Sequence, residues 1–270
     1  MINNLLRKTR KKLADENRFV KYWRYALGEI LLVVIGILIA LQVNNWNENR
    51  IEHNRIKKYA KSLVKDLEQD MEMLKVSLIQ AEDTYFRIDS LRNYVLQTEK
   101  ENLSNTLIYT IAHDIIYRTY SWNRSTFDEL KSSGSLRIIA NDSLKNKLVA
   151  YEAFTQHLDE DFNFDKINAE KVDDCLVEII NFNSPYLNKI KKWESESFNT
   201  PFNEKVKAEV FMESVANDLP LVSYDIEKLN RLVNTCILVQ DNYSVRAFLE
   251  MPEIIKNAQE LIALLKEEYK

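Results

Sequence analysis

Glycine and proline are scarce in this chain of 270 residues, which contains three glycines and four prolines. Soluble proteins average about 7% glycine and 5% proline. No proline precedes Pro185, and the Asn-Gly and Pro-Asp-Gly turns that join the strands of sheet proteins are absent. The scarcity excludes a turn-rich β fold and predicts an all-α protein with long helices.

The sequence also lacks the local motifs of the common enzyme and metal-binding classes. His53, His113 and His157 are isolated, with no His-x-x-x-His, Glu-x-x-His or Cys-x-x-Cys spacing. Neighbouring helical side chains such as His113 and Asp114 point about 100° apart and do not converge. Gly134 is the only glycine after residue 43, which excludes a phosphate-binding glycine loop and a Gly-x-Ser-x-Gly elbow. We therefore expect no metal, no cofactor and no enzymatic activity, although carboxylates from distant helices could still form a pair that this pattern search does not detect.

Cysteine is nearly absent, since Cys175 and Cys236 are the only two. A disulfide could join them in an oxidising compartment. Each lies in an apolar helical context, where a buried free thiol is common. The sequence favours two free thiols and leaves the disulfide open.

One long apolar run is present, from Tyr25 to Val43. At about 1.5 Å per residue its nineteen residues make a helix of roughly 28 Å, close to the thickness of the hydrocarbon core of a bilayer. Tyr22 and Trp23 precede the run and Trp46 follows it, at positions where amphipathic rings favour lipid headgroups. We predict a transmembrane helix over residues 25–43, with the lipid bilayer as its partner.

Charge predicts the orientation of this helix. Residues 1–24 carry eight basic and two acidic side chains, so the positive-inside rule makes them a cytoplasmic tail and places residues 44–270 outside. No small-x-small cleavage site follows the run, which favours an uncleaved signal anchor over a signal peptide. The whole chain has a net charge of −4, to which the tail contributes +6 and Glu29 contributes −1. Residues 44–270 therefore carry a net charge of −9. An acidic outer domain argues against a nucleic-acid partner.

Polar and small residues interrupt the anchor at a few positions. Glu29 lies about one turn after Arg24, where it can reach the inner headgroups, and the alternative is an intramembrane polar contact with a partner helix. Gly36 and Ala40 form a small-xxx-small pattern, and Gly28 falls on roughly the same face. This face permits close packing with a second copy or with another anchor.

Beyond the anchor, apolar residues step by three and four along one predicted helix that ends near Thr98. The heptad stripe is predicted to be either the core face of an intramolecular bundle, which we favour, or the seam of a parallel coiled-coil dimer. Its members are Ala60, Val64, Leu67, Met71, Leu74, Leu78, Ala81, Tyr85, Ile88 and Val95.

Shorter helices are predicted after Asn105. Ser125 with Asp128 or Glu129 resembles a capping box, and Gly134 can close that short helix in the left-handed conformation. The segment Asn141-Asp142-Ser143 is predicted to cap a helix that runs toward residue 180. A subdomain boundary is possible near residues 183–202. Pro201, Pro220 and Pro252 each precede or begin a later helix. Charged residues exclude residues 221–248 as a second membrane span.

Two segments resemble a known family. The first runs from Gly28 to Glu48 and reads GEILLVVIGILIALQVNNWNE; the second runs from Ser125 to Gly134 and reads STFDELKSSG. Both are similar to segments of an uncharacterised bacterial family of single-pass membrane proteins that is known only as a domain of unknown function. The resemblance implies membrane location and a helical build. Together with the orientation that the charges predict, it leads us to expect the anchor in the bacterial inner membrane and residues 44–270 in the periplasm. It carries over no catalytic or ligand-binding residue.

Three functional classes fit these observations. We favour a non-enzymatic envelope protein whose outer helical domain docks a protein partner or a second copy. A ligand-sensing bundle that signals laterally through its anchor is the alternative, and an enzyme without a recognisable motif is a third. Four aromatic residues could line a ligand pocket, although core packing is the simpler interpretation: Tyr109, Tyr117, Tyr120 and Trp122.

Overall fold

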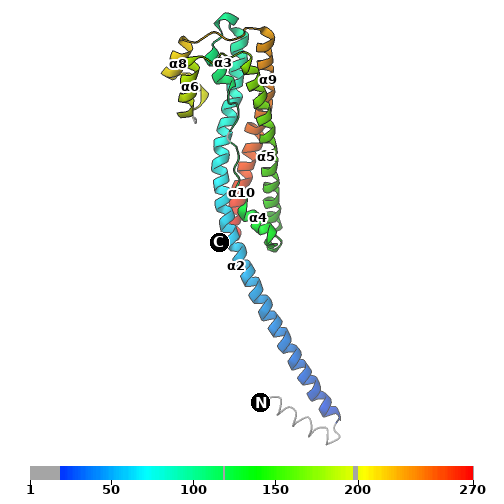
Figure 1. Ribbon diagram of the computed structural model, residues 1–270. Coiled ribbons are helices and arrows are strands. Elements are labelled where there is room, and N and C mark those ends of the chain that lie inside the picture. The colour runs from blue at the N-terminus through cyan, green and yellow to red at the C-terminus, as the bar shows by residue number, and fades with distance from the viewer. Residues whose placement is uncertain (1–18, 118, 197–199, 270) are drawn as a thin grey trace. The chain divides into compact units, whose positions relative to one another are not determined.

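The computed structural model describes residues 19–117, 119–196 and 200–269. These residues contain helices and irregular segments but no β-strand, which confirms the predicted all-α class (Figure 1). The basic residues among positions 1–18 lie outside the described part. The elements are α2 (Phe19–Gln97), η1 (Lys100–Asn102), α3 (Asn105–Ala112), α4 (Ser125–Ser132), η2 (Ser135–Ile138), α5 (Asp142–Val177), α6 (Pro185–Glu196), α7 (Phe202–Lys205), α8 (Glu209–Ala216), α9 (Ile226–Val245), η3 (Arg246–Glu250) and α10 (Met251–Glu268).

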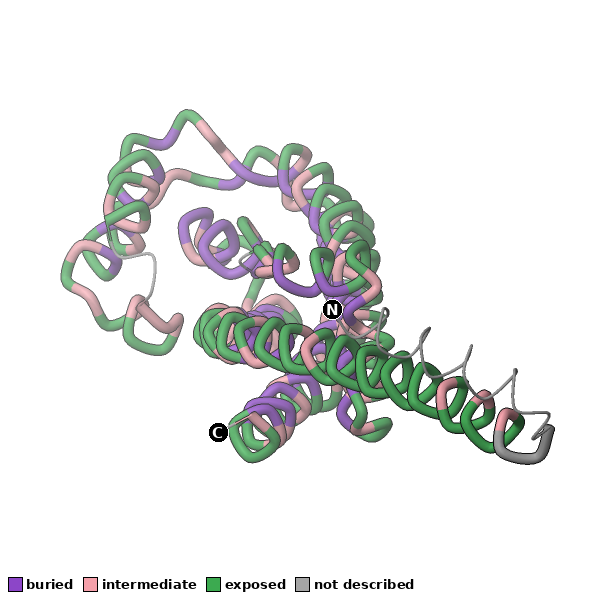
Figure 2. The backbone as a smooth tube through the Cα atoms, turned by 90° about the horizontal axis from the view of Figure 1, so that it is seen from below, coloured by how far each residue is buried: buried purple, intermediate pink, exposed green. Residues whose placement is uncertain are grey.

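The chain divides into two compact units, residues 1–58 and residues 59–270. Helix α2 is 79 residues long and contributes to both, so the expected single helix from the anchor to about Thr98 is confirmed. In the first unit the apolar side chains of the anchor are exposed all round the helix (Figure 2). In the described part of the chain, α2 is the one helix long and apolar enough to cross a membrane. The predicted domain boundaries stay predictions.

In the second unit, half of the expected stripe of α2 is buried as predicted. The five residues Ala60, Leu67, Leu74, Ala81 and Ile88 are at most 4% exposed. They are buried within a single chain, as expected for the core face of an intramolecular bundle. The seam that a coiled-coil dimer would use along these residues is therefore already covered.

Most of the other half of the stripe is shifted by one residue from the prediction. The structure buries Leu63, Asp70, Ser77 and Thr84 in place of Val64, Met71, Leu78 and Tyr85, which are half-buried. Near the end of the helix it buries Leu91 and leaves Val95 half-buried. The prediction was wrong here because three of the buried residues are polar. Asp70, for example, accepts hydrogen bonds from the backbone N and the Nδ2 of Asn123, both at 3.0 Å. These bonds offset part of the cost of its burial, which still raises the pKa of Asp70.

Four long helical segments build the core of the second unit. Helix α5 packs against α9 and α10, which follow each other with only the π-helical turn η3 between them. The α2 segment in this unit contacts all three: Tyr151 donates to Asp70 at 3.4 Å, Gln240 to the carbonyl of Tyr85 at 2.9 Å, and Lys266 to Glu68 at 2.9 Å. The result is a bundle of long helices, as the shortage of glycine and proline predicts (Figure 1).

Short helices gather at one end of this bundle, where α3 contacts α5, α6 and α8 (Figure 1). The carboxylate of Asp218, just after α8, accepts from the hydroxyl of Ser104 at 2.6 Å and from the backbone N of Thr106 at 2.6 Å. These bonds hold the start of α3 against the segment that follows α8. The short helices thereby form a wall beside α2.

The predicted caps of the shorter helices were partly correct. Ser125 and Asp128 do not form a capping box, because Arg124 occupies the N-cap position of α4 and no side chain caps it. The neighbouring Thr126 is buried and donates to Asp66 instead. Gly134 does adopt the predicted left-handed conformation, with φ of 73°, and Asn141 caps α5 by accepting from the backbone N of Leu144 at 3.1 Å.

Candidate functional site

A cavity of about 670 Å³ lies between α2 and the short helices of the second unit. Its wall mixes apolar side chains with charged groups of both signs, a composition typical of pockets that bind small molecules. The lining residues are Val76, Ile79, Gln80, Asp83, Thr84, Arg87, Tyr109, His113, Asp114, Ile116, Lys191, Glu194, Ser195, Thr200, Pro201 and Lys205.

Arg87 supplies a buried positive charge to this wall. The residue is only 7% exposed, and its guanidinium donates to the carbonyl oxygens of Thr110 at 3.4 Å and Asp114 at 3.2 Å. Its Nε has no hydrogen-bond partner, and no carboxylate oxygen of the described residues lies within 4.0 Å of it. Buried charges in proteins are normally paired, so this arginine is an exception that requires an explanation.

The backbone beside Arg87 is itself unusual. Asp114 has a φ of 52°, which makes it the one non-glycine residue of the described chain with a positive φ. Such conformations cost about 1–3 kcal/mol and cluster at binding sites. In this conformation the carbonyl of Asp114 accepts from Arg87. As expected, His113 does not pair with Asp114: its Nδ1 lies 3.1 Å from Asp173 and its ring stacks on Tyr109.

The remaining charges of the wall come mainly from α6 and the segment after it. Burial raises the pKa of Glu194, and the positive charges of Lys205 and Arg87 oppose the shift. Lys191 lies 5.2 Å from the ring centroid of Tyr109, a cation–π distance. Lys205 forms no ion pair with any described residue. The cavity therefore offers two lysines and a buried guanidinium beside three carboxyl groups, those of Asp83, Asp114 and Glu194.

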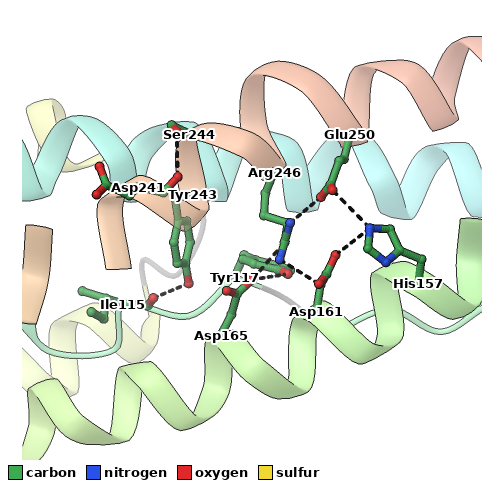
Figure 3. Close-up of polar contacts among 10 residues, drawn as sticks. All are labelled: Ile115, Tyr117, His157, Asp161, Asp165, Asp241, Tyr243, Ser244, Arg246 and Glu250. Carbon is green, nitrogen blue, oxygen red and sulfur yellow. Dashed lines mark hydrogen bonds and ion pairs between the residues drawn. The ribbon is translucent and has the colours of Figure 1, made fainter. Parts of the chain in front are cut away.

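A second charged cluster surrounds Arg246, which is 6% exposed (Figure 3). The guanidinium pairs with Asp161 at 3.0 Å, with Asp165 at 3.2 Å and with Glu250. Asp165 also accepts from the hydroxyl of Tyr117 at 3.1 Å. Burial raises the pKa of Asp165 while Arg246 opposes that shift; burial by itself would lower the pKa of Arg246, but the three carboxylates raise it.

The edge of this cluster carries a histidine. The Nε2 of His157 lies 3.2 Å from Asp161 and 3.3 Å from Glu250 (Figure 3). One ligand atom from each of these three residues lies within 4.8 Å of the other two, a separation that suits a metal ion. Glu250 ends the π-helical turn η3 that begins at Arg246, and such turns are frequent at functional sites.

The anchor residues singled out in the sequence do not meet one another in a site. Gly28, Gly36 and Ala40 are exposed, and a Cβ added at either glycine would meet no atom within 4 Å. Glu29 is half-buried. Their packing and polar contacts in a bilayer stay predictions.

The aromatic and cysteine predictions can be compared with the structure directly. Of the four aromatic residues considered for a pocket, only Tyr109 lines the large cavity. Tyr117 and Tyr120 are buried and pack against each other at 5.6 Å, so core packing is confirmed for them, while Trp122 donates to Asp159 at 2.7 Å. Cys175 and Cys236 are buried free thiols. Burial raises the pKa of Cys236 to about 12.

Sequence reasoning missed Arg87, Glu194 and Arg246. The sequence could have pointed to Arg87, because it lies next to Ile88, a member of the predicted apolar stripe of α2. Glu194 gave no local signal. For Arg246 the sequence shows only Glu250, four residues later, because its other partners, Asp161 and Asp165, come from a distant helix.

Comparison with known proteins identifies a family but not an activity. Residues 29–191 match a family of unknown function, DUF6090. The match covers more than half of the chain, so the chain belongs to this family. No curated protein and no solved structure matches it.

Proposed function

We propose that this member of the DUF6090 family is a single-pass membrane protein whose outer helical domain binds a small anionic ligand in the Arg87 cavity. In this proposal α2 anchors the chain in the bacterial inner membrane through residues 25–43. The N-terminal tail is cytoplasmic and the cavity opens into the periplasm. Binding is not coupled to catalysis.

The observation that carries the proposal is the unpaired, buried guanidinium of Arg87 in the wall of a 670 Å³ cavity. A carboxylate or phosphate that accepts from Nε would supply the missing acceptor and a negative charge in direct contact with the guanidinium. Val76, Ile116 and Pro201 line the same cavity and could pack against an apolar body. The expected ligand therefore joins one anionic group to a small apolar part.

This proposal ranks ligand binding above the docking role that we first expected from the sequence. The docking role rests on missing motifs and an acidic surface, whereas the cavity is a positive structural feature. An enzyme is less well supported, because Ser195 in the wall donates to the carbonyl of Lys192 at 2.6 Å rather than to His113. Glu194 is the residue that a catalytic alternative would use as its acid or base.

Thermal unfolding of the full-length protein in detergent tests the proposal. The ligands are alkyl carboxylates, phosphates and sulfonates of four to eight carbons, each compared with the uncharged amide or alcohol of the same length. A ligand at a hundred times its Kd stabilises the native state by about 2.7 kcal/mol. We expect at least one anion to raise Tm and its uncharged analogue to leave Tm unchanged.

Two variants locate the effect. Arg87→Gln should abolish the rise in Tm. Arg231→Gln is the matched control and should keep the rise in full, since Arg231 is an exposed arginine that pairs with Glu178 at 2.9 Å and does not line the cavity. Absence of any stabilising anion, or a rise that persists in Arg87→Gln, would contradict the proposed function.

The proposed topology has its own test. Alkaline phosphatase, which is active only outside the cytoplasm, would be fused after residue 270 and, separately, after residue 24. We expect activity from the first fusion alone. Activity from the second fusion alone would reverse the orientation.

A further inference from the structure

We propose that His157, Asp161 and Glu250 form a binding site for a divalent transition-metal ion such as Zn²⁺. This site is separate from the Arg87 cavity and independent of its ligand. Imidazole nitrogen and carboxylate oxygen are common zinc ligands, and three protein ligands plus a water molecule make an open tetrahedral site.

Two of the three distances between the ligand atoms match such an ion, and the third, between the carboxylate oxygens of Asp161 and Glu250, is at most 4.8 Å. With metal–ligand bonds of about 2.0–2.1 Å, two ligands of a tetrahedral zinc ion lie about 3.3–3.4 Å apart. The Nε2 of His157 lies 3.2 Å from Oδ2 of Asp161 and 3.3 Å from Oε1 of Glu250. Metal binding would thus require only small movements of side chains that already converge (Figure 3).

Arg246 fixes the orientation of the two carboxylates. Arg246 contacts the other oxygen of each group, Oδ1 of Asp161 and Oε2 of Glu250. The oxygens that face His157 are the ones that these two contacts leave over, and Oδ2 of Asp161 is buried, with its ion-pair contact to Nε2 of His157 at 3.2 Å. Groups that hold the ligands of a metal in this way increase its affinity and fix its geometry.

The charge balance of the cluster also favours a cation. Arg246 contributes one positive charge against the negative charges of Asp161, Asp165 and Glu250. With a neutral imidazole the cluster has a net charge of −2, which one divalent ion would neutralise. The side chain of His157 is 51% exposed, so the ion could enter from solvent.

Zinc titration of the full-length protein tests this proposal. The protein would carry a purification tag without histidine, be stripped with EDTA, and be titrated with ZnCl₂ at pH 7 by isothermal calorimetry. We expect one equivalent to bind and to raise Tm, because the ion joins α5 to η3. His157→Gln, a change at an exposed residue, should weaken binding at least about tenfold.

His53→Gln is the matched control. His53 is also an exposed histidine, but it is not one of the three residues whose ligand atoms converge, so this variant should bind zinc as the wild type does. Failure of the wild type to bind zinc, or equal binding by His157→Gln, would overturn the proposal and indicate a simple ion pair. Neither result bears on the Arg87 cavity, whose test uses no metal.

Discussion

Two arginines of the second unit are almost equally buried but lie in opposite electrostatic environments. Arg246 is 6% exposed and contacts three carboxylates, whereas Arg87 is 7% exposed and contacts two backbone carbonyls. Both charges had to be removed from water when the chain folded. Three carboxylates of the protein compensate the charge of Arg246. At Arg87 only two carbonyl oxygens contact the guanidinium, so the loss of hydration is compensated less fully.

We propose that this difference separates a structural role from a binding role. Arg246 joins α5 to η3, and a guanidinium in such a network is required because its removal leaves like charges buried together. Arg87 lies at the wall of a cavity, where an incoming anion can take the place of the missing carboxylate. The comparison predicts that one arginine serves stability and the other serves binding.

The largest expected effect is that of Arg246→Met on stability. The substitution leaves Asp161, Asp165 and Glu250 without their shared cation, and breaking a buried pair costs about 3–5 kcal/mol. Urea unfolding followed by circular dichroism would measure the free energy of unfolding. The exposed Arg231→Gln should cost at most about 1 kcal/mol. Equal losses of unfolding free energy in the two variants would contradict a special structural role for the buried arginine.

Arg87→Met should change stability far less than Arg246→Met. It loses two long hydrogen bonds, each worth about 0.5–1.5 kcal/mol, but it also removes a buried and unpaired charge. We expect the free energy of unfolding, without ligand, to stay within about 1 kcal/mol of the wild-type value in the same urea experiment. A loss as large as that of Arg246→Met would mean that Arg87 is a structural residue.

The smallest expected effect concerns Glu194 and pH. Because burial raises the pKa of Glu194 in the folded protein, its contribution to stability is present at low pH and is lost as pH rises through that raised pKa. Glu194→Gln should therefore gain stability relative to the wild type as pH rises from the ordinary glutamate range toward neutrality. Unfolding curves at several pH values would show this, with Glu209→Gln, at an exposed residue, as control. Parallel pH profiles for the wild type and Glu194→Gln would contradict the assignment.

The sequence predicted the helices better than the site, for a physical reason. Helix α2 could be predicted because nothing in it interrupts helical periodicity after Gly36, and Gly134 could be placed because few other residues adopt a positive φ. Asp70, Ser77 and Thr84 were missed on the buried face because hydrophobicity alone does not show which polar groups find partners.

The site depends on contacts between distant segments. Arg87 on α2 lines a cavity whose other walls include residues of α6 and of the segment that begins at Thr200. His157 and Asp161 are one helical turn apart, a spacing that the sequence does show, but Glu250 reaches them only through the packing of η3 on α5. Such convergence is a property of the tertiary structure and leaves no local pattern.

The most direct test of the comparison is an NMR experiment on arginine side chains. The Nε–H signals of the full-length protein, labelled with ¹⁵N-arginine, would be recorded with and without a saturating anion found by the thermal screen. Arg87→Gln and Arg246→Met would assign the two signals. The account predicts that the Arg87 signal shifts on binding while the Arg246 signal stays in place. Anion binding that leaves the Arg87 signal unchanged would contradict it.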